Sequence, residues 1–296
     1  MTSVGADPIP AIREEDATGH VATNYQDLRA TLGIPIVNLI WRHLATIPGG
    51  LAWVWTLVKP LYVSGELDRL SDATSALVSF PTLAPLPDFV WDGVAIDSND
   101  RRAIARLIES YNRGNGVNFL ALLVVVSVLR DGLPASRGSG CVAQVKSSHH
   151  SAAEASQRLL GLSELSPPVS ALVRQLDEFG RLGSSDAIAS LYRHLAHWPA
   201  FLAMAYAALE PLHRNGELAN AQQRVIAFGR QESALLVSHI DSELPALAPD
   251  AAKAVLSALD EFTRLMIGRM IVMGKALRSL IPSGDDGRTH NEDRNT

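Results

Sequence analysis

The sequence predicts an all-α protein built from two tandem helical repeats that pack against each other as a pseudo-twofold dimer within one chain. Three observations predict this fold class. One stretch of sequence recurs 151 residues later, apolar residues recur at helical spacing, and no stretch alternates apolar and polar residues over the length of a strand. Each repeat covers about 120 residues.

The recurring stretch is long and aligns without a gap. Trp41–Leu67 matches Tyr192–Leu218, and twelve of the 27 aligned residues are identical. The same offset places the predicted helix 101–111 over 252–262, apolar on apolar. Self-similarity at a fixed offset indicates a duplicated structural unit. Such units pack like a homodimer joined by a linker, and ligand sites in helical bundles lie between facing helices.

Prolines and glycines predict helix boundaries at equivalent points of the two repeats. Pro48 and Pro199 stand where one helix is expected to end and the next to begin, because a missing N–H costs little there. Gly65 and Gly216 predict left-handed helix stops, and Pro60 and Pro211 predict a kink or an end of the helix. Asp97 and Pro249 predict the start of the fourth helix of each repeat.

These signals divide the chain into four segments. Repeat 1 covers 10–130 and repeat 2 covers 161–282. Between them, 131–160 is rich in Gly, Ser and Ala and is predicted to be a flexible linker. The polar tail 283–296 is predicted to be disordered.

Composition narrows the class of protein. Of the 296 residues, 47% are apolar, and the net charge of −5 is spread over both signs, so no basic nucleic-acid-binding face is expected. The longest apolar run, Phe119–Leu129, is about half of a bilayer span and indicates a buried core helix rather than a membrane segment. With Cys141 as the single cysteine and no signal peptide visible, we expect a cytoplasmic protein.

Three motifs resemble the group I D,L-2-haloacid dehalogenases: TLGIPIVNLIWRHLATIPG (Thr31–Gly49), SYNRGN (Ser110–Asn115) and LAHWP (Leu195–Pro199). The resemblance covers nearly the whole chain and includes the duplication. It implies a helical pseudo-dimer with the active site between the repeats. It also implies that an aspartate activates water, which displaces halide from the α-carbon of a small 2-haloacid with inversion and without a covalent ester.

The resemblance assigns the water-holding asparagine to Asn115, which ends the motif Tyr-Asn-Arg-Gly-Asn. Its repeat counterpart is Met266, so this position breaks the internal symmetry, as a site residue should. A structural role is the alternative, in which Asn115 caps a helix or satisfies a buried carbonyl group.

The aspartate of the family has no counterpart in an ungapped alignment. The expected position, after Ser190 and seven residues before Trp198, is occupied by Leu191. A gapped alignment assigns the catalytic base to Asp186 in the sequence Ser-Ser-Asp, which also suits a helix N-cap. Both interpretations stay open.

The resemblance also identifies substrate-binding positions, some of which differ from the family. Ile36 and Leu39 replace aromatic residues, and Phe262 replaces a tyrosine, so the pocket keeps a ring and loses a hydroxyl. Asn38 can return a hydrogen bond, and Ser190 completes the set. No metal or organic cofactor is implied, and a homodimer is possible.

The pairs Arg42-His43 and Arg193-His194 are retained in both repeats. Two converging arginines could hold a substrate carboxylate bidentately, or the pairs could stabilise the interface between the repeats. Retention in both copies favours the structural role. Because Leu191 stands where the base is expected, the alternative function is a helical ligand-binding protein, or a different hydrolase that has lost the dehalogenase base.

Overall fold

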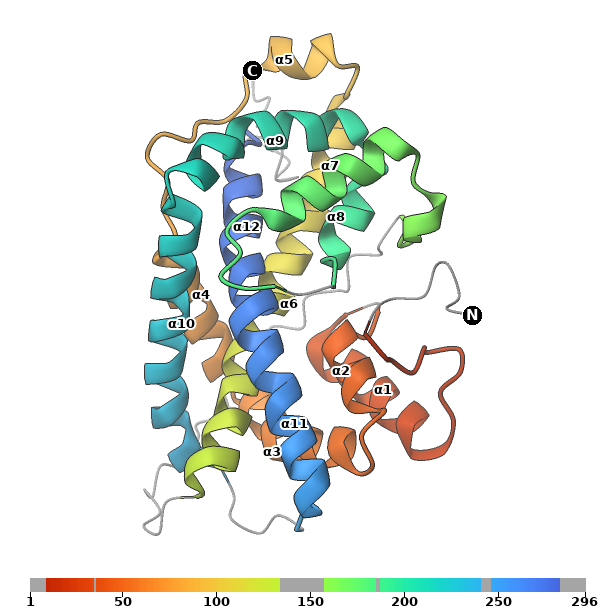
Figure 1. Cartoon of the computed structure of the whole chain (residues 1–296), viewed down its shortest axis with the longest axis vertical. Helices are drawn as coiled ribbons and strands as arrows, with labels where there is room; N and C mark the ends of the chain where they lie inside the picture. Colours follow the sequence, from red (N-terminus) through yellow and green to blue (C-terminus); the bar gives the residue numbers. More distant parts are fainter. Residues whose placement is uncertain (1–8, 35, 134–156, 185–186, 241–245, 283–296) are drawn as a thin grey trace, which may run out of the picture.

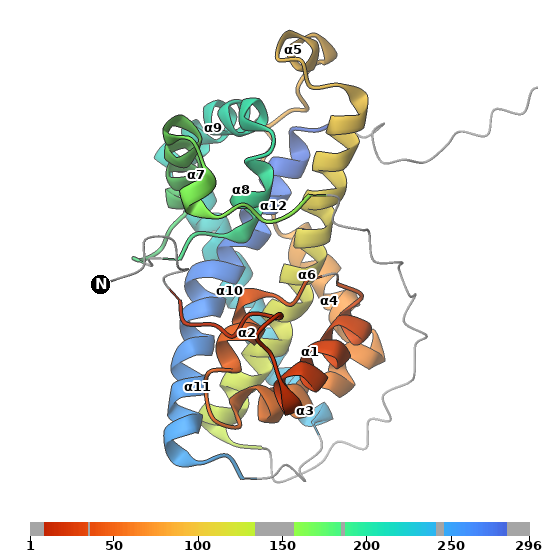
Figure 2. The same cartoon turned by 90° about the vertical axis from the view of Figure 1, so that its right-hand side faces the viewer.

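A computed structural model describes residues 9–34, 36–133, 157–184, 187–240 and 246–282 of the chain. Within these residues all regular structure is helical, as the sequence predicts, and no strand is present. The helix α6 (Ser98–Asp131) and the column from α11 to α12 (249–279) run along the molecule. The helices within 19–64 gather near one end of these elements and those within 167–214 near the other (Figures 1 and 2).

The helices of the first half precede the segment 134–156, and those of the second half follow it. The first half contains α1 (Gly19–Leu32), α2 (Leu39–Leu44), α3 (Gly50–Ser64), α4 (Glu66–Ala76), α5 (Asp88–Gly93) and α6 (Ser98–Asp131). The second contains η1 (Leu162–Glu164), α7 (Pro167–Glu178), α8 (Ser190–Leu195), α9 (Pro199–Arg214), α10 (Glu217–Leu236), η2 (Val237–His239), α11 (Pro249–Glu261), the π-helical η3 (Phe262–Ile267) and α12 (Gly268–Ser279).

The helix boundaries follow the sequence offset. α2 and α8 both begin and end 151 residues apart, α4 and α10 begin 151 residues apart, and so do α6 and α11. The continuous column α11–η3–α12 thus corresponds to the single helix α6. This correspondence supports the repeat that the sequence analysis infers.

Local chemistry explains most of these boundaries. The Asp97 carboxylate accepts hydrogen bonds from the N–H groups of Asn99 and Asp100, each at 2.8 Å, and so caps α6. Gly65 and Gly216 have φ values of 76° and 81°, the left-handed conformation that glycine adopts without strain. Of the two alternatives predicted at Pro60 and Pro211, a kink or a helix end, the end is excluded, because α3 and α9 continue through these prolines.

α6 forms the centre of the core. It packs against α3, α4, α10, α11 and α12, and its residues from Phe119 to Val126 are buried, as predicted for a core helix. By length and composition α6 is the one helix, within the described part of the chain, that could cross a membrane, but 72% of its apolar window is buried inside the protein. Burial of this extent is typical of a core helix.

Each short helix docks on the long column of the other half. α2 contacts α11, and α8 contacts α6. The ring of His43 stacks on Phe262 with centroids 5.8 Å apart, and the ring of His194 meets Tyr111 edge-on at 5.7 Å. His43 and His194 are 151 residues apart in the sequence, and so are Tyr111 and Phe262. The two halves therefore make equivalent contacts with each other.

Several predictions fall outside the described residues. Most of the predicted linker (134–156, with Cys141) and the tail 283–296 are among these segments. The end of the predicted linker is described, and it packs: the Leu160 carbonyl accepts a hydrogen bond from Arg193 Nε at 2.7 Å.

The crossing of α10 and α6 leaves no room for a side chain at Gly229. A Cβ built there would lie 2.3 Å from Cε1 of the buried Phe119. We expect Gly229→Ala to lower the free energy of unfolding by about 1–2 kcal/mol, since overpacking outweighs the gain in helix propensity.

The matched control is Gly114→Ala in α6, where a Cβ would meet nothing within 4 Å. This variant should be stabilised by about 0.5–1 kcal/mol, measured by urea unfolding. Equal effects of the two substitutions would contradict the packing argument.

Candidate functional site

Two adjoining cavities lie between the halves, where α2 and α8 approach α6 and η3. The larger has a volume of about 90 Å³ and the smaller about 60 Å³. Four residues belong to the walls of both cavities: Asn38, Leu39, Tyr111 and Ser190. The combined space suits a few water molecules or a small organic molecule.

Six residues selected by the sequence analysis line these cavities. Asn115 and Phe262 line the smaller cavity, and Ile36, 40% exposed, lies at the edge of the larger one. Asn38, Leu39 and Ser190 line both. The structure therefore brings together residues that are far apart in the sequence.

The sequence offers two positions for the catalytic base, one from the gapped and one from the ungapped alignment. Asp186, the position of the gapped alignment, lies outside the described residues. Leu191, which occupies the ungapped position, is 1% exposed and lines the smaller cavity. Its side chain adds an apolar surface to the wall and has no proton-accepting group.

The helix α6 supplies one polar face to the site. Tyr111, Asn115 and Asn118 are spaced four and three residues apart, so they lie on the same side of the helix, and all three line the smaller cavity. Across the cavity, Met266 of η3 occupies the position equivalent to Asn115. The two walls therefore differ in polarity at equivalent positions.

Asn118, which the sequence analysis does not select, organises this face. Its Oδ1 accepts hydrogen bonds from Tyr62 Oη at 2.7 Å and from Trp41 Nε1 at 3.3 Å. Its Nδ2 donates to Asn38 Oδ1 at 3.3 Å. Because both donors fix the amide orientation, the Asn38 side chain is held with its oxygen toward Asn118. Its partners are far away in sequence, so no local signal reveals it.

Tyr111 and His194 form a hydrogen bond of 2.7 Å between Oη and Nδ1 at the boundary of the two cavities. Burial, with the nearby charges of His197 and Arg193, lowers the pKa of His194 to about 4. Burial raises the pKa of Tyr111 well above its usual range. Both groups are therefore neutral at pH 7, and one proton lies in the hydrogen bond between them. His194 Nε2 is buried and has no hydrogen-bond partner within the described structure.

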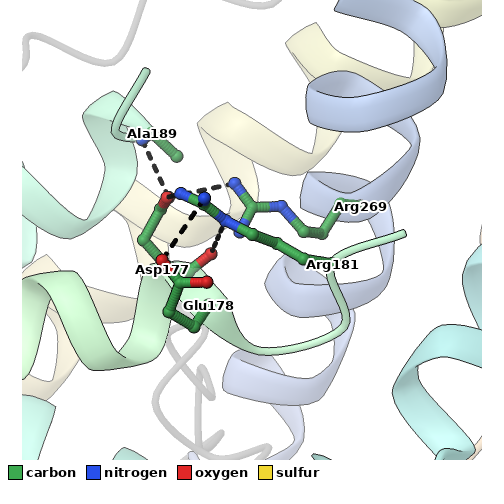
Figure 3. Close-up of polar contacts among 5 residues, drawn as sticks. All are labelled: Asp177, Glu178, Arg181, Ala189 and Arg269. Carbon is green, nitrogen blue, oxygen red and sulfur yellow. Dashed lines mark hydrogen bonds and ion pairs between the residues drawn. The ribbon is translucent and has the colours of Figure 1, made fainter. Parts of the chain in front are cut away.

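A buried ion-pair cluster holds the chain just before α8 (Figure 3). Asp177, 1% exposed at its side chain, pairs with Arg269 at 3.0 Å and with Arg181. The same carboxylate accepts a hydrogen bond of 3.0 Å from the backbone N–H of Ala189. Ala189 lines the smaller cavity and precedes Ser190. The cluster thereby fixes the entry into α8 and the wall of the site.

The described residues contain no group of three or more His, Cys, Asp or Glu side chains arranged to hold a metal ion. The polar groups of the site are instead amides, hydroxyls, a neutral imidazole and the guanidinium of Arg42. Such a set can orient a polar ligand by hydrogen bonds and attract an anion.

Comparison with known proteins finds one group of relatives. A configuration-inverting 2-haloacid dehalogenase from Alcaligenes xylosoxydans xylosoxydans is 24% identical over 198 residues, and the aligned region covers 65% of this chain and 65% of that protein. The match thus spans just under two thirds of the relative's length. No family model matches the sequence.

Solved structures show the same fold. A D-2-haloacid dehalogenase mutant in complex with D-2-CPA has a TM-score of 0.71 at 17% sequence identity and covers 94% of this chain and 98% of its own. A D-2-haloacid dehalogenase in complex with L-LA has a TM-score of 0.71 at 16% identity, covering 94% and 97%. The chain therefore shares the fold of these enzymes over nearly its whole length.

The low pKa of His194 predicts a pH dependence of stability. Between about pH 6.5 and pH 4 the unfolded chain binds a proton on this residue while the folded protein does not. The free energy of unfolding should therefore fall as the pH drops through this window, by up to about 3 kcal/mol.

Urea unfolding between pH 4 and pH 7 measures this effect. Replacing His194 by Gln should flatten the slope, whereas His43→Gln at the equivalent position, whose ring is part-exposed, should leave it unchanged. A slope that is the same in wild type and His194→Gln would rule out this residue as the source.

The Asp177 cluster predicts a large loss of stability when its acid is removed. Asp177→Ala leaves the Arg269 cation, 2% exposed, without its counter-charge, so we expect unfolding free energy to fall by about 3–5 kcal/mol. Glu15→Ala removes an exposed pair with Arg13 and should change it by less than about 1 kcal/mol. Comparable losses in the two variants would show that the buried cluster contributes no special stability.

Proposed function

We propose that this chain, a divergent relative of the 2-haloacid dehalogenases, hydrolyses small 2-haloalkanoic acids by direct attack of water. One observation carries the proposal. Asn115, the residue that the resemblance assigns to holding water, lies in the same cavity wall as Asn38, Ser190 and Phe262. The cavities are small and mostly apolar, which suits a short 2-substituted acid.

The reaction forms one bond and breaks one. The oxygen of a water molecule bonds to the α-carbon from the side opposite the halide, the carbon–halogen bond breaks, and halide leaves with the bonding electron pair. The water proton passes to the carboxylate of Asp186, the proposed general base. The product is the 2-hydroxyacid of inverted configuration, and no covalent intermediate forms with the protein.

In this proposal Asn115 positions the water. Its side chain extends from α6, a long and mostly buried helix, so the amide is presented by a rigid element. An amide can accept one hydrogen bond from water and donate another, and these bonds fix the direction of the lone pair on the water oxygen. In-line displacement depends on that alignment more than on the strength of the base.

The apolar wall has a role in the same step. Leu39, Leu191, Phe262 and Met270 give the smaller cavity much of its apolar wall. In such surroundings the nucleophilic water and the departing halide exchange their hydration shells for fixed protein groups. Phe262 supplies a ring without a hydroxyl, so hydrogen bonding to the acid falls to the amide and serine side chains.

The chain is also proposed to act in the cytoplasm. The single cysteine, Cys141, permits no internal disulfide, as is usual for proteins of a reducing compartment.

Halide release from D- and L-2-chloropropionate by the purified protein tests the function. Wild type should release chloride above background and yield inverted lactate, measured by chiral chromatography. Asp186→Asn should lower kcat by at least about 100-fold, because the base is lost. Asn115→Ala should lower kcat by about 10- to 100-fold with the fold retained.

Ser184→Ala, two residues before Asp186, is the matched control and should keep wild-type kcat. A wild type that releases no chloride from either enantiomer would exclude the function and favour a ligand-binding protein of the same fold. Full activity in Asp186→Asn would exclude this base alone.

A further inference from the structure

Arg42 stands out among the residues of the larger cavity because its charge is not compensated. Within the described structure it makes no ion pair, and its Nε is buried without a hydrogen-bond partner. A buried N–H group without a partner is destabilising, and more so when the group is charged. Arg42 as a whole is part-exposed and lines the larger cavity, so an anion that enters the cavity can reach its guanidinium.

The equivalent arginine of the second half has a different environment. Arg193 is 8% exposed, and its Nε donates a hydrogen bond of 2.7 Å to the Leu160 carbonyl. Arg193 is therefore tied into the packing of the segment before α7. The two arginines occupy equivalent positions in the sequence, but Arg42 alone lines a cavity described here.

The acids around Arg42 are engaged elsewhere. Glu14 is one such acid, since its charge and that of Arg42 both act on the pKa of the Tyr25 phenol. Its carboxylate pairs with Arg29 at 2.8 Å and accepts a hydrogen bond from the Val37 N–H at 2.8 Å. Neither cavity has an Asp or Glu among the described residues of its wall. The cavity thus combines an uncompensated guanidinium with mostly apolar walls, where the attraction for an anion is stronger than in water.

The neighbours of Arg42 suit one kind of anion. Asn38 and Ser190 line the same cavity and offer an amide N–H and a hydroxyl O–H. A guanidinium presents its donors in a planar fork that matches the two oxygens of a carboxylate. The limited volume favours a short aliphatic chain beside that carboxylate.

We propose that Arg42 binds the carboxylate of a small aliphatic monocarboxylic acid in the larger cavity, with the acid's α-carbon directed toward the smaller cavity and Asn115. The assignment to the substrate of the reaction rests on the proposed dehalogenase function, whereas carboxylate binding by Arg42 does not. Charge recognition and water activation are then performed in adjoining cavities that share Asn38, Leu39, Tyr111 and Ser190.

Isothermal titration of the full-length protein with sodium propionate and with propionamide tests the site without relying on turnover. Wild type should bind propionate at least ten-fold more tightly than the neutral amide of the same shape. Arg42→Gln should weaken propionate binding by about 10- to 100-fold and leave propionamide binding within about two-fold. Arg42→Lys should retain part of the affinity, because the charge remains and the planar fork is lost.

Arg224→Gln is the matched control, since it removes one exposed positive charge from α10 and should bind propionate as wild type does. Equal binding of propionate and propionamide by wild type, or undiminished propionate binding by a folded Arg42→Gln, would overturn the proposal. A parallel titration with sodium bromide tests whether Arg42 binds halide instead. If Arg42→Gln loses bromide binding and keeps propionate binding, the anion that Arg42 binds is the halide, and the proposal is overturned. Arg42→Lys and the amide comparison in wild type keep the test valid if Arg42→Gln does not fold.

Halide release separates this inference from the proposed function. Propionate binding that depends on Arg42, in a protein that releases no chloride, would support the carboxylate site and exclude the dehalogenase. Chloride release with unchanged KM in Arg42→Gln would support the dehalogenase and overturn the role of Arg42.

Discussion

The exchange of contacts between the two halves is the constraint on which the site depends. α2 docks on the α11 column and α8 on α6, so each short helix is held by the half to which it does not belong. The ring contacts His43–Phe262 and His194–Tyr111 fix these two dockings at nearly the same separation. The cavities lie between the two dockings, and neither half could enclose them alone.

Within this frame, differences between equivalent positions produce a polar wall and an apolar wall. Asn115 faces a cavity that Met266 also lines, and the hydrogen bond of Tyr111 to His194 has no equivalent at Phe262, which lacks a hydroxyl. Asn118 binds Trp41 and Asn38, whereas Arg269 at the equivalent position pairs with Asp177. One polar network thus lines the cavity, and the other anchors the chain beside it.

The sequence alone predicts the all-α class and most helix ends, because helical periodicity and capping are local signals. The six residues that converge on the cavities come from the resemblance to the dehalogenase family. The sequence does not predict the role of Arg42. Arg42 and Arg193 have similar neighbours in sequence, and what distinguishes them includes contacts with distant residues, such as the hydrogen bond of Arg193 to the Leu160 carbonyl. The same holds for Asn118, and for the π-helical turn at Phe262–Ile267, which belongs to a tertiary packing that no local pattern encodes.

The joining of two similar units in one chain removes a symmetry constraint from a site that lies between them. In a dimer of identical chains, every residue occurs twice, so a pocket on the twofold axis must be lined by matching groups, and an off-axis pocket occurs in two copies. Here Asn115 and Met266, which occupy equivalent positions, line the same cavity. A molecule bound in this cavity would accordingly meet a different surface on each side, so the site is handed.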